Sequence, residues 1–137
     1  MRRINYSILC LVFVVFLVSG CRQNHIEGEP DVISSRKMNH DETLTVVANR
    51  DTIEDKEKFA ELLIKKCKDN SFQSIKFSTD NGYATSLELQ VYLWSDQIKG
   101  RDPVMEIEYL PVEWGKEYDI VHNPENFQMY IDGKLIN

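Results

Sequence analysis

The spacing of apolar residues between positions 43 and 70 predicts a strand followed by a helix. Residues 44–48 form a short apolar, β-branched run, which is typical of a strand. Further along, apolar residues recur at intervals of three and four, so they fall on one face of a helix over residues 53–68. Thr52 is suited to the N-cap of this helix, and Asn70 to a left-handed C-cap. The predicted apolar face consists of Phe59, Leu62, Leu63 and Cys67.

After the helix the period changes to two, which is the period of a strand with one buried face. The alternation is longest over residues 85–94, where leucine and valine face one side and polar or aromatic residues face the other. An Asn-Gly pair at 81–82 favours a hairpin turn before this strand. The remaining predicted strands are residues 74–78, 104–110, 127–131 and 134–136, with 118–121 as a further candidate.

These elements predict an α+β domain over residues 43–137. One amphipathic helix packs on one face of an antiparallel meander sheet, in the order β-α-β-β-β-β. Residues 21–42 contain few apolar residues and no period, so we expect a flexible tether there. The half of the core supplied by the sheet is expected to be the stripe of Leu87, Leu89, Val91 and Leu93.

The chain begins with two arginines and an uninterrupted apolar run from Ile8 to Val18. Eleven helical residues span about 17 Å, which is too short for a bilayer core of about 30 Å but suits the core of a signal peptide. The run ends in Val18-Ser19-Gly20-Cys21, which resembles the lipobox of bacterial lipoproteins. The resemblance implies a signal peptide over residues 1–20, cleavage between Gly20 and Cys21, and a diacylglycerol thioether on Cys21. An ordinary secretory peptide and an uncleaved signal anchor are the alternatives.

Net charge limits the class of partner. The chain has 16 basic and 22 acidic side chains, and removal of the predicted signal peptide takes away only Arg2 and Arg3. The remaining 117 residues therefore carry 14 basic and 22 acidic groups, a formal charge of −8. This balance argues against a nucleic-acid partner, which attracts clustered lysine and arginine, and against electrostatic adhesion to anionic lipid. We expect the acyl chains alone to hold the protein at the cell membrane, on its extracytoplasmic side.

Cysteine usage and motifs give no sign of an enzyme. Loss of Cys10 and acylation of Cys21 leave Cys67 unpaired, and its place on the apolar helix face predicts a buried thiol rather than a nucleophile. The sequence contains no phosphate loop, serine-hydrolase elbow or zinc-binding spacing. We expect neither a cofactor nor a metal. The glutamates expected on the outer face of the sheet, as solubility groups rather than acid–base catalysts, are Glu88, Glu106 and Glu108.

Aromatic residues are the candidates for a binding site. Tyr92 and Trp94 fall on the polar side of the longest predicted strand, and Trp114 and Tyr118 flank a turn. Exposed tryptophan and tyrosine are favoured anchors at protein interfaces. We therefore predict that these four residues form a binding patch. The alternatives are that a loop or the chain terminus covers them, or that they pack across strands as ordinary sheet stabilisers.

The sequence thus favours a membrane-anchored lipoprotein whose extracytoplasmic domain binds a protein or peptide. A structural or accessory subunit of an envelope complex is the alternative function, and a hydrolase is the third.

Overall fold

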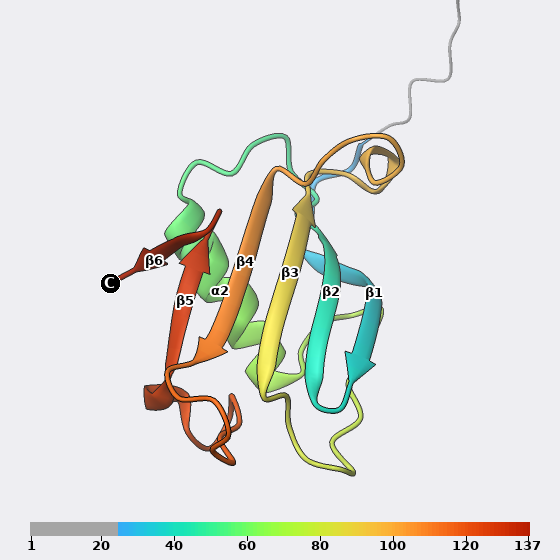
Figure 1. Ribbon diagram of the computed structural model, residues 1–137. Coiled ribbons are helices and arrows are strands. Elements are labelled where there is room, and N and C mark those ends of the chain that lie inside the picture. Colours follow the sequence, from blue (N-terminus) through green and yellow to red (C-terminus); the bar gives the residue numbers. More distant parts are fainter. Residues whose placement is uncertain (1–24) are drawn as a thin grey trace, which may run out of the picture.

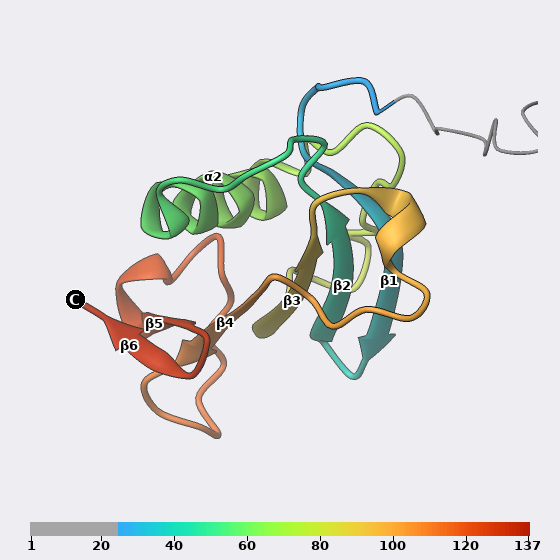
Figure 2. The same cartoon turned by 90° about the horizontal axis from the view of Figure 1, so that it is seen from above.

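The computed structural model describes residues 25–137 as a six-stranded sheet with one long helix across one of its faces. Figure 1 looks onto the face that the helix leaves uncovered, and Figure 2 shows helix and sheet as two layers. The strands lie side by side in chain order, and the predicted α+β class is confirmed. The elements are β1 (Asp31–Met38), β2 (Asp41–Val47), α2 (Lys56–Asp69), β3 (Ser86–Tyr92), β4 (Met105–Pro111), β5 (Phe127–Ile131), β6 (Lys134–Ile136) and two short 3-10 helices at Ser95–Gln97 and Pro124–Asn126.

The first strand lies where the sequence predicts a tether. β1 pairs antiparallel with β2 through a turn at Asn39, whose φ is 57°. In this edge strand Val32 is buried, but the residues of the strand from Ile33 to Met38 are exposed. A strand held chiefly by backbone pairing carries no apolar period, which is why the tether prediction is wrong for residues 31–42. The rest of the predicted tether before residue 25, Cys21 included, and the predicted signal peptide lie outside the described residues.

The pairing of β2 with β3 is parallel, whereas every other neighbouring pair in the sheet is antiparallel. The connection through α2 carries the chain back across the sheet, so β3 starts at the same end as β2. The prediction of an antiparallel meander is therefore correct from β3 to β6 and wrong for the pairing of β2 with β3. A period of two shows that a strand has one buried face, but it does not show the direction of its neighbour.

The helix α2 begins three residues later than predicted. Asp55, rather than Thr52, is the N-cap, and its carboxylate accepts a hydrogen bond from the amide of Lys58 at 3.0 Å. Asn70 ends the helix in the left-handed conformation, with φ 51°, as predicted. Leu62 is 36% exposed and does not belong to the buried face. That face consists of Phe59, Ala60, Leu63, Ile64 and Cys67.

Two of the predicted strands, residues 74–78 and 118–121, are loops. The side-chain amide of Asn70 exchanges hydrogen bonds with both backbone groups of Phe77, at 2.8 and 3.0 Å. The carboxylate of Asp119 accepts hydrogen bonds from the amides two and three residues further on, at 2.9 and 2.7 Å. Local bonds between side chain and backbone thus replace the ladder bonds of a strand in both segments.

The hydrophobic core fills the space between α2 and the sheet. The stripe predicted for β3 is confirmed at Leu87, Leu89 and Val91, which are buried, while Leu93 beyond the strand end is partly buried. Phe72 enters the same core from the long loop between α2 and β3, and its side chain is fully buried. The residues that alternate with these core positions lie on the opposite, helix-free face.

Candidate functional site

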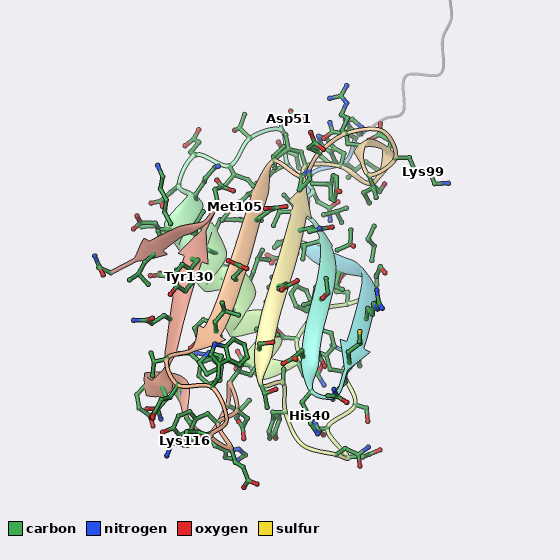
Figure 3. The ribbon with its side chains drawn as sticks, in the orientation of Figure 1. His40, Asp51, Lys99, Met105, Lys116 and Tyr130 are labelled. Carbon is green, nitrogen blue, oxygen red and sulfur yellow. The ribbon has the colours of Figure 1, made fainter. Side chains whose placement is uncertain are left out.

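The helix-free face of the sheet presents the alternate residues of each strand (Figure 3). The registers of the five strand pairings align one row across all six strands, with a basic residue at β1, glutamates in the centre and an apolar residue at β6. Tyr130, labelled on β5 in Figure 3, belongs to this row. The row consists of Arg36, Thr43, Glu88, Glu108, Tyr130 and Leu135.

Two glutamates stand directly opposite each other at the centre of this face. Glu88 on β3 and Glu108 on β4 are cross-strand partners, and Glu106 faces Gln90 two residues along the same strands. All four side chains line a shallow groove of about 190 Å³. Within residues 25–137, no lysine, arginine or histidine nitrogen lies within 4.0 Å of the three carboxylates. Like charges opposite each other in a sheet are destabilising, by roughly 0.2–1 kcal/mol, so this arrangement does not serve stability.

Tyr92 and Trp94, which the sequence predicts to be exposed, are buried, with 8% and 5% of their surfaces accessible. Tyr92 is the last residue of β3 and lies opposite Val47, which is also buried. Trp94 follows the strand, and its indole N–H donates a hydrogen bond to the carboxylate of Asp51 at 3.2 Å. Alternation predicts the side from which a side chain leaves the sheet, but not whether a neighbouring segment covers it.

The other two aromatic residues of the predicted patch lie at the opposite end of the sheet. β3 and β4 are antiparallel, so Trp94 after β3 and Trp114 after β4 are separated by the length of the strands. Trp114 is 66% exposed, whereas Tyr118 is partly buried against the core. The prediction of one aromatic patch is therefore wrong, and of its four residues only Trp114 is exposed.

Cys67 is buried, as predicted, and lies near a carboxylate that the sequence assigns to the tether. Burial raises the pKa of the Cys67 thiol, which disfavours the reactive thiolate. Glu42 on β2 is 5% exposed, and its burial raises the pKa of its carboxyl group although Lys37 lies 3.7 Å away. Glu42 and Cys67 line a cavity of about 20 Å³, which is room for one water molecule. A glutamate in a polar segment gives no sequence signal of burial.

Two of the three histidines in residues 25–137 each contact a single carboxylate, whereas Nδ1 of His40 is buried without a hydrogen-bond partner among these residues. His25 lies beside Asp96, and Nδ1 of His122 lies 2.8 Å from the carboxylate of Asp119. Within residues 25–137, histidine, cysteine and carboxylate side chains do not gather in threes as a metal site requires.

None of the helices in the part of the chain that the structure describes is both long enough and apolar enough to cross a membrane. Comparisons with protein-family models, with curated proteins and with solved structures found no match.

Proposed function

We propose that this chain is a membrane-anchored bacterial lipoprotein whose extracytoplasmic domain binds a basic segment of a protein or peptide. The binding proposal rests on one observation, the uncompensated Glu88–Glu108 pair on the helix-free face of the sheet. The anchor rests on the resemblance of Val18-Ser19-Gly20-Cys21 to a lipobox.

The described domain begins close to the proposed anchor. A chain from Cys21 to His25 reaches at most about 15 Å. The segment that follows is docked on the domain, because the Gly28 amide donates to the carbonyl of Asn49 at 3.0 Å and the Asn49 side chain donates to the carbonyl of Glu29 at 2.8 Å. An acyl anchor on Cys21 would therefore hold the end of the sheet at which β2 finishes close to the bilayer.

A basic partner would supply the charges that the helix-free face lacks. Glu88 and Glu106 are exposed and Glu108 is partly exposed, so lysine or arginine side chains can reach all three. Tyr130 beside Glu108 adds an aromatic ring on which a cation can rest. Each exposed ion pair contributes about 0.2–1 kcal/mol, so several pairs are needed for useful affinity. Binding of this kind weakens with salt, and the attraction acts mainly on the rate of association.

The test is the affinity of the full chain, in a neutral detergent, for a decalysine peptide. Glu88→Gln/Glu108→Gln should weaken binding by up to about thirtyfold at low salt, because two ion pairs worth up to about 1 kcal/mol each are lost. The matched control is Glu57→Gln/Glu61→Gln, which removes the same charge from exposed positions of α2. We expect the control to bind like the unaltered chain.

Equal weakening in both double variants would mean that the peptide responds to net charge and not to this face. The binding proposal would then fail, and the accessory subunit of an envelope complex would be the better function.

A further inference from the structure

The connection between β3 and β4 holds a tryptophan ring in a fixed position. Trp94 precedes the 3-10 helix Ser95–Gln97, and its carbonyl accepts a hydrogen bond from the amide of Gln97 at 3.1 Å. The edge of its indole is fixed by the hydrogen bond from Nε1 to the carboxylate of Asp51. With the edge held in this way, a face of the ring is available for stacking beside Asp96 of the 3-10 helix.

That face is occupied by a side chain from the beginning of the described chain. The imidazole of His25 stacks on the indole of Trp94 with ring centroids 4.3 Å apart and planes inclined by 7°. Its Nε2 lies 3.1 and 3.0 Å from the two carboxylate oxygens of Asp96. One planar nitrogen-bearing group thus stacks on the indole and contacts a carboxylate through its ring nitrogen.

His25 is held differently from the residues that follow it. The Gly28 amide donates to the carbonyl of Asn49, the Glu29 carbonyl accepts from the side-chain amide of Asn49, and Pro30 is fully buried. Between them and His25, Ile26 is 82% exposed. Within residues 25–137, His25 is held through its imidazole ring, and its side chain is 35% exposed. His25 can therefore leave Trp94 while the rest of the docked segment stays in place.

We propose that the Trp94 ring face and the Asp96 carboxylate form a binding site for the guanidinium of an arginine side chain on a partner, and that His25 occupies this site as an internal competitor. A guanidinium is planar and permanently charged, stacks on aromatic rings and binds carboxylates through two parallel hydrogen bonds. It would reproduce both contacts that the imidazole makes. A lysine ammonium, which is a compact point charge, cannot stack in the same way.

This site is separate from the glutamate pair of the proposed function. Trp94 lies beyond the end of β3, whereas Glu88 lies within that strand and forms no hydrogen bond or ion pair with Trp94 or His25. The two proposals are therefore tested by different variants, and one can fail without the other.

The experiment uses the full chain in a neutral detergent with Trp114→Phe, which leaves Trp94 as the only tryptophan. The probe is N-acetyl-arginine amide, and the matched control compound is N-acetyl-citrulline amide, which has the same shape without the charge. Binding is followed by the indole N–H resonance and the fluorescence of Trp94.

Removal of the competitor should reveal the site. In His25→Ala the arginine probe should bind about tenfold or more tightly than in the unaltered chain, because the site is no longer occupied by the protein itself. The citrulline compound should not bind, and Asp96→Asn added to His25→Ala should abolish binding of the arginine probe. His25→Phe keeps a ring over Trp94 and should bind no better than the unaltered chain.

Two results would overturn the proposal. One is a folded His25→Ala variant, with a native-like spectrum, that does not bind the arginine probe. The other is equal binding of the arginine and citrulline compounds, since the carboxylate would then have no part in recognition.

Discussion

At the scale of single residues, Glu42 makes the folding stability depend on pH. Its carboxyl group is buried against the cavity beside Cys67, and burial raises its pKa above the ordinary value of 4.5. The folded state therefore binds the proton more tightly than the unfolded chain does. The contribution of Glu42 to stability is most favourable below pH 4.5 and is lost as the pH rises through the raised pKa of the folded state.

Glu42→Gln should remove this loss. We expect the variant to gain stability relative to the unaltered chain at pH 7 and to gain less at pH 4. The difference between the two gains should be about 1.4 kcal/mol for each unit by which burial raises the pKa of Glu42 in the folded state. Urea unfolding at the two pH values measures the difference, and Glu54→Gln, at an exposed position, is the control. A gain that is the same at both pH values would contradict the assignment.

Trp94 and Trp114 show how far residue-level reasoning reaches. Both are tryptophans, a residue type that is enriched at protein interfaces, and the sequence does not distinguish them. The structure separates them, because Trp94 is covered by His25 and held by Asp51, whereas Trp114 is 66% exposed. The cover on Trp94 comes from a residue 69 positions earlier in the chain, which no local pattern records.

The two tryptophans should therefore respond differently to truncation. Trp94→Ala should cost about 3–5 kcal/mol of folding stability, as for a buried aromatic residue. Trp114→Ala should change stability by less than about 0.5 kcal/mol. Chemical unfolding of the two variants measures both values, and equal losses would show that burial has been assigned to the wrong tryptophan.

At the scale of elements, the sequence predicts well what depends on a buried stripe and poorly what depends on pairing. β3 and β4 are predicted because each alternates core and surface residues. β1 is missed because its pairing with β2 uses backbone groups and leaves most of its side chains exposed. The loops at 74–78 and 118–121 are mistaken for strands because bonds from Asn70 and Asp119 to the backbone leave no trace in hydrophobicity.

The position of β1 predicts where the folded domain can be cut. A chain that starts at Thr43 loses all of β1 and the first two residues of β2, and it exposes the backbone edge of a central strand. We expect this truncation to lose cooperative thermal unfolding and to aggregate. A chain that starts at Cys21 should unfold cooperatively under the same conditions, and identical melting of the two would contradict the role of β1.

At the scale of the whole molecule, the sequence does not predict the two surfaces on which the proposals rest. It predicts the correct face for Glu88, Glu106 and Glu108, but their alignment across strands depends on register, which local patterns do not determine. The stack of His25 on Trp94 depends on tertiary contact between distant segments. Of the features on which the proposals rest, the lipobox resemblance is the one that the sequence shows directly, and it lies outside the described residues.

The proposed anchor has a direct test in living cells. Cys21→Ala should prevent incorporation of labelled palmitate and leave an unprocessed precursor, because the acylated thiol is absent. The control is Cys10→Ala, whose cysteine lies within the predicted signal peptide and should not alter labelling. Labelling of Cys21→Ala at the level of the unaltered chain would exclude lipidation at this residue.

The central claim is that Glu88 and Glu108 are placed for a partner and not for the stability of the sheet. The most direct measurement is the equilibrium unfolding of Glu88→Gln/Glu108→Gln in urea at neutral pH and low salt. Because the variant removes a like-charge pair between neighbouring strands, we predict that it is more stable than the unaltered chain by about 0.2–1 kcal/mol. A loss of stability would show that the two carboxylates hold the sheet together, and it would contradict the claim.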